Sequence, residues 1–322
     1  MISLTNIGDI IAISPSMDVL LNDFPDAQLS VIVGPKGRSL FEQNPNIDRV
    51  YVYDKHAVLR DKIKWWSQLR LEKFDAIVDF RNSLLPFILH ASTRTPPEFF
   101  MSKKLHLVEK HLTRLKGIYH FERKASLRKA ITILPADRGH VDSLLSGFLK
   151  REERFILVAP VAADSAKTWD PQCFAKVCDA LISKYGIKVV MVGGSENLEV
   201  INEIQRQMKN PFLALAGQTN LVQVADLVNR AFFSIVHDSG IMHLASYFNR
   251  QVLALFGPTD PRLSGPWSEN SGYIWKNQKC PRCLDSKLNE RHQCMSQITP
   301  EDLLNCIDIK DSKVILKTIQ SL

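Results

Sequence analysis

The chain has 322 residues, of which 45% are hydrophobic and 23% charged, and its formal net charge is +7. This length is about that of two typical domains, and the ordinary composition excludes a disordered or low-complexity chain. No run of 18 apolar residues occurs, so we expect no transmembrane helix. The first residues lack the basic flank of a signal peptide, which favours a cytoplasmic location.

The positive charge is concentrated in the first half. Residues 101–130 contain nine basic and two acidic residues. Two interpretations fit this pattern: a binding surface for an anionic partner, or a basic face that is simply solvated. We expect no nucleic-acid partner.

Short apolar runs alternate with longer amphipathic segments, which is typical of a parallel sheet covered by helices. In the first half, strands are predicted near 1–4, 29–33, 49–53 and 76–79. Helices are predicted over 10–22, 38–43, 58–71, 83–91, 104–117 and 138–149. The domain boundary is placed near residue 150.

The second half repeats the pattern. Strands are predicted over 155–160, 189–192, 212–215, 232–236 and 252–256, and helices over 171–184, 196–208, 221–230 and 240–248. A last helix is predicted over 300–321, after Thr299-Pro300-Glu301. Two successive halves of this kind predict an α/β protein with two Rossmann-like, doubly wound domains that face a cleft.

Ligands of doubly wound sheets bind beyond the carboxyl ends of the strands. The segment after strand 232–236, Asp238-Ser239-Gly240-Ile241-Met242-His243, opens a helix. Free backbone N–H groups at a helix start bind anions, so this segment is the strongest candidate for a phosphate site. Asp238 is suited to orienting the turn, and His243 to donating to the anion one turn later.

Other strand ends carry single polar residues. Lys167 follows the strand ending at Pro160 and can reach phosphate oxygens, although a lone lysine is more often only solvated. Glu196 follows Gly193-Gly194 and suits ribose hydroxyls, with a plain helix-start acid as the alternative. Asp9 follows the first strand and is either a general base or a complement to the helix dipole.

Five segments in this order resemble the ADP-heptose:lipopolysaccharide heptosyltransferase family, glycosyltransferase family 9. They are Ile7-Gly8-Asp9, Lys167-Thr168-Trp169, Gly193-Gly194-Ser195-Glu196, Asp238–Ala245 and Leu255–Pro261. The last two together are the most specific, and the five segments span nearly the whole chain.

The resemblance implies a GT-B architecture. The acceptor-binding domain would cover 1–150, the nucleotide-sugar domain 151–300, and a C-terminal helix, 301–322, would cross back to the first domain. It further implies an inverting transfer without a bound metal or cofactor. The donor would be an ADP-sugar and the acceptor an anionic lipid-linked core oligosaccharide, at the inner face of the cytoplasmic membrane.

The resemblance also implies roles for individual residues. Asp9 would deprotonate the acceptor hydroxyl, and the donor would be held by Lys167, Glu196, Thr219, Leu221, Asp238, Ser239, Gly240 and His243. The acceptor or the membrane surface would meet Lys103, Lys104, Lys110, Arg114, Arg123 and Lys124. The chain departs from the pattern in a short first strand, and in Ala162 and Ala163, where many relatives carry hydroxyl or small polar residues.

The six cysteines are expected to be reduced thiols, because no secretion signal accompanies them. Cys173 and Cys178 fall in a predicted helix and are expected in the core. Cys280, Cys283, His292 and Cys294 have a loose zinc-ligand spacing, so a structural zinc and packed thiols are alternative interpretations.

Two further function classes remain open at this stage. A sugar-nucleotide epimerase on the same architecture would need the donor but no acceptor. A binding protein with a decayed site would be consistent with Ala162 and Ala163, but the retained Asp9, Lys167 and His243 argue against it.

Overall fold

The computed structural model describes residues 1–3, 6–97, 104–122, 127–150, 153–276, 294–310 and 313–320. The chain forms two compact units, Met1–Thr132 and Ile133–Leu322. The division lies earlier than the expected boundary near residue 150. The reason is that helix α7 (Pro135–Leu145) packs against helix α10 (Leu221–Arg230) of the second unit, where Arg230 forms an ion pair with Asp142.

The first unit is built on parallel strands. β1 (Ser30–Val33) pairs with β2 (Arg49–Val52), and β3 (Lys73–Ile77) pairs with β4 (His90–Arg94). Ile2 bridges both Ile32 and Asp79, so the first residues of the chain lie between the two pairs. The resulting order is β2, β1, residues 1–3, β3, β4, with the first residues at the centre.

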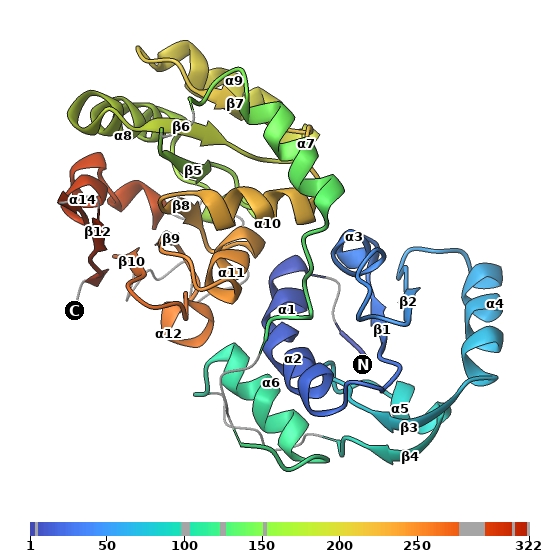
Figure 1. Ribbon diagram of the computed structural model, residues 1–322. Coiled ribbons are helices and arrows are strands. Elements are labelled where there is room, and N and C mark those ends of the chain that lie inside the picture. The colour runs from blue at the N-terminus through green and yellow to red at the C-terminus, as the bar shows by residue number, and fades with distance from the viewer. Residues whose placement is uncertain are drawn as a thin grey trace. The chain divides into compact units, whose positions relative to one another are not determined.

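Helices cover both faces of this sheet (Figure 1). α4 (Leu59–Arg70) and α5 (Leu85–Ile88) pack on a cluster that contains Ile32. Val31 and Val33 are also buried, and they point to the opposite face because side chains alternate along a strand. Helices α1 (Ile7–Ala12), α2 (Ser14–Asp23) and α6 (Leu107–Lys116) pack against one another, and the short α3 (Arg38–Phe41) precedes β2.

The second unit contains a seven-stranded parallel sheet in the order β13-β10-β9-β8-β5-β6-β7. Its strands are β5 (Phe155–Ala159), β6 (Lys188–Met191), β7 (Leu213–Ala214), β8 (Ser234–His237), β9 (Val252–Phe256), β10 (Gly272–Trp275) and β13 (Ile319–Gln320). Every residue of β5 and β9 is buried, as expected for parallel strands covered on both faces. The strand order reverses between β5 and β8, which makes the loops after these strands the topological switch point.

Two groups of helices pack on this sheet (Figure 1). α8 (Pro171–Tyr185), α9 (Leu198–Gln207) and α14 (Pro300–Asn305) pack around one hydrophobic cluster, which includes Cys178 as predicted. α10 contacts both α7 and α11 (Gly240–Tyr247), and the short α12 (Pro261–Ser264) follows β9. Among the described residues, no helix combines the length and apolar character that crossing a membrane requires.

The predicted C-terminal helix is wrong. α14 ends at Asn305 and is followed by an antiparallel hairpin of β11 (Ile307–Lys310) and β12 (Lys313–Leu316). β13 then pairs with β10, so this segment completes the sheet of the second unit instead of returning to the first as a helix. The exposed and buried residues of β12 alternate, which is the period of a strand. In the first unit, the predicted helix 83–91 is only α5, and the strand β4 that follows it was missed.

Candidate functional site

The predicted donor-binding residues all lie at the carboxyl edge of the second unit's sheet. The loop after β5 carries Lys167, and the residue after β8 is Asp238. The Lys167 Nζ atom lies 2.6 Å from Asp238 Oδ2, and the two side chains are 22% and 8% exposed. The structure thus brings together two residues that are 71 positions apart in the sequence, at the switch point of the sheet.

Thr259 joins the same group from the loop after β9. Its Oγ1 donates a hydrogen bond of 2.6 Å to Asp238 Oδ2, the oxygen that also receives the Lys167 ammonium. One carboxylate oxygen therefore connects the loops after β5, β8 and β9. The segment Leu255–Pro261 was named from the sequence, but Thr259 was given no role, although its position just after a strand was a usable signal.

Ser239 stands at the N-cap of α11 with an extended backbone, φ −150° and ψ 171°. A serine in this position usually accepts a hydrogen bond from the first turn of its helix. Here Oγ is buried and makes no such bond with any described residue. The N–H groups of the first turn, beginning at Gly240, have no partner within the helix. Unused donors at a helix start fit an anionic ligand.

His243 lies one turn into α11. His243 is only 4% exposed, and the centroid of its ring lies 5.3 Å from the centroid of the Trp267 ring. The structure thus places His243 in the interior, against an aromatic side chain. Its predicted contact with a phosphate group stays a prediction.

The loops after β6 and β7 form the neighbouring part of the edge. The Glu196 carboxylate occupies the space in which a side chain on Gly194 would lie, and the Gly217 N–H donates to Gly193 O at 3.0 Å. Gly217 has φ +71°, a conformation that favours glycine. Thr219 Oγ1 is buried and has no hydrogen-bond partner among the described residues, which makes it a second unused hydroxyl at this edge.

Asn220 fixes the start of α10. Its side chain accepts hydrogen bonds of 2.9 Å from the N–H groups of Val222 and Gln223, and the Asn220 N–H donates one of 3.0 Å to Gln223 Oε1. This capping box satisfies backbone donors at the helix start. It holds Leu221 as the first residue of α10, next to Thr219.

A buried histidine lies behind the site and binds the loop that carries Lys167. His237 ends β8, is fully buried, and accepts a hydrogen bond of 2.9 Å on Nε2 from the Trp169 backbone N–H. Burial lowers the pKa of His237 to about 3, so the ring is neutral and able to accept. The Trp169 indole in turn donates to Ile298 O at 2.9 Å. Through these two hydrogen bonds, Trp169 holds the Lys167 loop against β8.

Asp9 lies in the other unit, in the first turn of α1, and is half-buried. The Asn6 side chain donates to Asp9 Oδ2 at 3.3 Å. α1 begins soon after residues 1–3, so Asp9 lies at the carboxyl end of the central strand, as expected. Both interpretations of Asp9, base and dipole partner, are compatible with this position.

Three of the predicted acceptor residues, Lys104, Lys110 and Arg114, lie among the described residues. Lys104 is exposed and Lys110 is half-buried. Arg114 is only 7% exposed, and its guanidinium donates to Asp79 O and, at 3.4 Å, to Asn82 Oδ1 and Pro96 O. Arg114 thus anchors the loop after β3. Lys103, Arg123 and Lys124 lie outside the described residues.

The zinc interpretation is untested. Cys280, Cys283 and His292 lie outside the described residues, and Cys294 is buried. Within the described part of the chain, no group of three or more metal-ligating side chains occurs.

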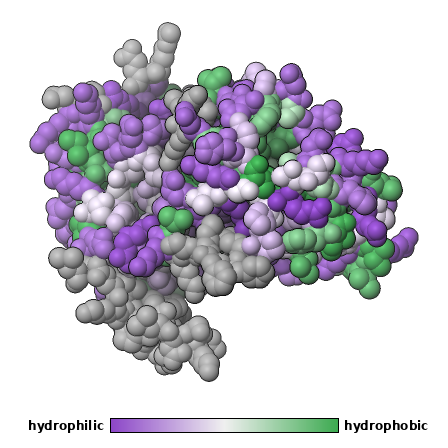
Figure 2. Space-filling view, turned by 90° about the horizontal axis from the view of Figure 1, so that it is seen from below, coloured by the Kyte–Doolittle hydropathy of each residue, from purple (hydrophilic) through white to green (hydrophobic). Residues whose placement is uncertain are grey.

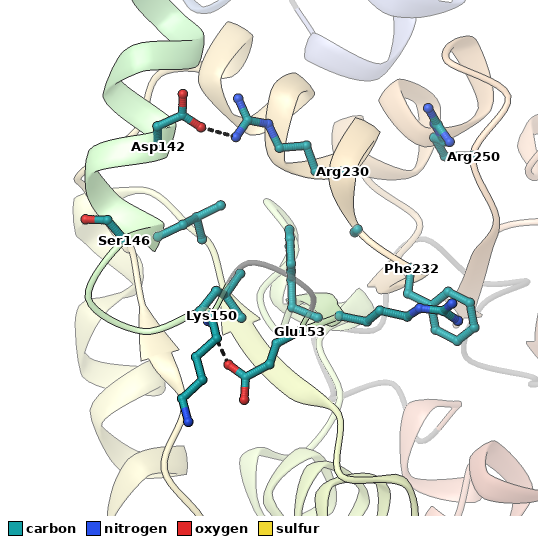
Figure 3. Close-up of a pocket in the computed structure, with 12 residues that line it drawn as sticks. Asp142, Ser146, Lys150, Glu153, Arg230, Phe232 and Arg250 are labelled. Atoms are coloured by element: carbon teal, nitrogen blue, oxygen red, sulfur yellow. Dashed lines mark hydrogen bonds and ion pairs between the residues drawn. The ribbon is translucent and has the colours of Figure 1, made fainter. Parts of the chain in front are cut away.

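A pocket of about 510 Å³ lies at the opposite, amino edge of the same sheet (Figure 3). Its lining includes Phe155 at the start of β5, Phe232 before β8 and Arg250 before β9. Figure 3 shows Asp142 turned toward Arg230, with which it forms an ion pair. None of the predicted donor-binding residues lines this pocket, so it is separate from the candidate site.

Comparisons of the chain with family models and with known proteins point to the same protein family. The family model described as glycosyltransferase family 9 (heptosyltransferase) matches residues 63–293, more than half of the chain. The chain is 26% identical to lipopolysaccharide heptosyltransferase 3 of Escherichia coli K12, over 92% of this chain and 93% of that relative.

Solved structures agree on the fold. A family 9 glycosyltransferase of Veillonella parvula has a TM-score of 0.79 and 23% identity, with 94% of each chain covered. The E. coli ADP-heptose LPS heptosyltransferase II has a TM-score of 0.73 and 22% identity, over 94% of this chain and 95% of that one. The predicted α/β fold of the GT-B class is thereby confirmed. The predicted cleft between the units is not tested by this likeness.

Proposed function

Because the chain belongs to glycosyltransferase family 9, we propose that it transfers a heptosyl group from ADP-heptose to a lipopolysaccharide core acceptor. The enzyme class, a glycosyltransferase, follows from the family. The donor sugar, the acceptor and the catalytic roles belong to the proposal. The observation that carries it is the Lys167–Asp238–Thr259 group at the switch point, beside the unused donors at the start of α11.

The donor diphosphate would bind at the start of α11. Ser239 Oγ and the first N–H groups of the helix supply donors without requiring any rearrangement of existing hydrogen bonds. Lys167 adds a positive charge, which Asp238 holds in place. Thr219 Oγ1 is also a buried hydroxyl without a partner among the described residues, and it lies on the loop where the nucleoside would bind. Glu196 would accept hydrogen bonds from the ribose.

The proposed mechanism depends on which groups become charged during the transfer reaction. In an inverting displacement, the departing nucleoside diphosphate gains negative charge as its bond to the sugar breaks. Fixed donors around that diphosphate stabilise the transition state, and each is worth about 10²–10³-fold in rate. Asp9 would accept the proton of the acceptor hydroxyl as that oxygen attacks the anomeric carbon, and one carboxylate suffices because no covalent intermediate forms.

The test combines a donor screen with one substitution. Purified protein is incubated with ADP-heptose or other nucleotide sugars, with and without a lipopolysaccharide core acceptor, and nucleoside diphosphate release is measured. We expect acceptor-dependent release of ADP. Asp9→Asn should abolish transfer while the affinity for ADP, measured by calorimetry, stays the same. Asp26→Asn, an exposed aspartate of the same unit, serves as the control.

Two outcomes would overturn the proposal. Turnover of the Asp9→Asn variant at the wild-type rate would remove Asp9 from the reaction. Conversion of the donor to a different nucleotide sugar in the absence of acceptor would instead identify an epimerase.

A further inference from the structure

Exposed apolar side chains are concentrated on one part of the first unit. Of the large hydrophobic residues that the described structure leaves exposed, more than half fall within residues 58–88. They are Val58 (66% exposed), Leu59 (72%), Ile63 (59%), Leu71 (84%), Leu84 (75%), Phe87 (50%) and Ile88 (45%). Scattered exposed apolar residues need no explanation, but a concentration of this kind marks an interaction site.

Four of these residues belong to two helices that share one face of the sheet, and the other three, Val58, Leu71 and Leu84, are cap residues at the ends of these helices. α4 carries Leu59 and Ile63, and α5 carries Phe87 and Ile88. Other side chains of the same helices, including Trp65 and Leu85, pack on the cluster around Ile32 and Ile77. α4 and α5 therefore pack on the same cluster, and we call their outer surface the α4–α5 face. Figure 2 shows hydrophobic side chains among polar ones on the side where Figure 1 draws these helices.

The same face is positively charged. α4 contains four basic residues, Arg60, Lys62, Lys64 and Arg70, and a single acidic residue, Asp61. Within the described part of the chain, none of the four forms an ion pair with a carboxylate. The Lys62 Nζ atom donates to Lys55 O at 2.8 Å, and no carboxylate among the described residues neutralises these four charges.

The combination of residues indicates the partner. Leu59 and Ile63 are spaced four residues apart, so they lie on one side of the helix, and half-buried Trp66 follows three residues after Ile63. Lysine and arginine interleaved with apolar and tryptophan residues are typical of helices that lie in a membrane interface. Interfaces between proteins, by contrast, are depleted in lysine.

We propose that the α4–α5 face docks the first unit on an anionic lipid surface. The apolar side chains of α4 and α5 enter the boundary between headgroups and acyl chains, and the four basic residues of α4 meet the lipid phosphates. This surface differs from the basic stretch 103–124 that the sequence pointed to, where Arg114 is buried. This proposal rests on the proposed function, in which the acceptor is part of a membrane lipid.

Vesicle sedimentation tests the docking without donor or acceptor. The whole protein is mixed with phosphatidylglycerol vesicles or with phosphatidylcholine vesicles, and the bound fraction is measured at low and high salt. We expect binding to the anionic vesicles only, weakened by salt because exposed charges are screened. Lys62→Glu/Lys64→Glu should weaken binding at least tenfold, since each basic residue near the lipid contributes about fivefold. Leu59→Ser/Ile63→Ser should weaken it as well.

Matched variants in the second unit provide the control. Leu198→Ser removes an exposed leucine from α9, and Lys176→Glu/Lys209→Glu reverses two exposed lysines. These variants should bind vesicles like the wild type. The proposal is overturned if the α4 variants bind as tightly as the wild type, or if the wild type ignores vesicles and instead self-associates through this face.

Failure of the docking and failure of the proposed transfer are distinguishable. With a water-soluble acceptor fragment, Leu59→Ser/Ile63→Ser should retain wild-type turnover, whereas with the acceptor in vesicles its turnover should fall. Loss of turnover on the soluble fragment would show that these residues serve the reaction itself, which would contradict a docking role.

Discussion

Asp238 is a carboxylate that the fold has almost removed from water. Two donors compensate for that burial, the Lys167 ammonium and the Thr259 hydroxyl, and both approach the same oxygen at 2.6 Å. Removing one donor from a buried acceptor costs about 1–3 kcal/mol. Thr259 therefore acts as a positioning residue, because it shares the carboxylate that fixes Lys167.

Thr259→Val tests this role with a side chain of the same shape. We expect the KM for the donor to rise about tenfold, with a smaller effect on kcat, because Asp238 would hold Lys167 more tightly and in an altered position. Thr259→Ser should restore the wild-type KM, since it returns the hydroxyl. Thr113→Val, on the exposed side of α6, is the control. A donor KM that stays unchanged in Thr259→Val would contradict the role.

His237 makes the stability of the protein depend on pH. Its pKa is about 3 in the folded state and about 6.5 in an unfolded chain. Between these values the unfolded state binds a proton that the folded state does not, so the free energy of unfolding falls as the pH is lowered from about 6.5 toward 3. The loss attributable to His237 approaches about 1.4 kcal/mol per pH unit.

Denaturant unfolding between pH 7 and 5 measures this slope. His237→Gln should be less stable at neutral pH but should show a flatter pH dependence. His140→Gln removes an exposed histidine and should keep the wild-type slope. Equal slopes for the wild type and His237→Gln would assign the acid sensitivity to other groups.

At the scale of single elements, the sequence predicted best where burial was complete. The strands β5 and β9 are uninterrupted apolar runs, and such runs have few alternatives in a folded protein. β4 was missed because its exposed residues, such as His90, hide the pattern of a strand. The C-terminal helix was overextended because Thr299 does cap a helix, but only a short one.

The features of the site that could not be predicted from the sequence depend on tertiary contacts. The positions of Lys167, Asp238 and Ser239 were predictable, because each follows a recognisable strand. The ion pair between Lys167 and Asp238 was not, since it depends on β5 and β8 being neighbours. The burial of Arg114 was equally invisible, because its partners lie 35 and 18 residues away in the chain.

The cap of α10 offers a test at the element scale. Asn220→Ala removes the side-chain acceptor for two backbone N–H groups and should lower the free energy of unfolding by about 1 kcal/mol. Because Thr219 and Leu221 flank the cap, the affinity for ADP should fall too. Asn220→Asp keeps an acceptor and should behave almost like the wild type. Full stability of Asn220→Ala in thermal unfolding would refute the assignment.

At the scale of the whole molecule, each unit has a hydrophobic cluster of its own. The cluster around Ile32 belongs to the first unit, and the cluster around α8 belongs to the second. All the proposed donor-binding residues lie in the second unit, and Asp9 lies in the first. Donor binding and proton transfer are thus assigned to separately folded parts of one chain.

Calorimetry should resolve this division. We expect two unfolding transitions, and ADP should raise the Tm of one of them only, the transition of the second unit. At a concentration one hundred times its Kd, the ligand should add about 2.7 kcal/mol to the stability of that unit. Lys167→Met should reduce the shift, whereas Asp9→Asn should not. A single transition, or an equal shift of both, would be inconsistent with this assignment.

The pairing of β13 with β10 has a consequence for chains that are synthesised incompletely. Ile319 and Gln320 cover the outer hydrogen-bonding groups of Ile274 and Trp275. In a chain that stopped before β13, those groups would be exposed on β10 as the new edge strand. Such an edge is a template for strands of other molecules and promotes aggregation. The last strand of the sheet thus protects the protein from associating with copies of itself.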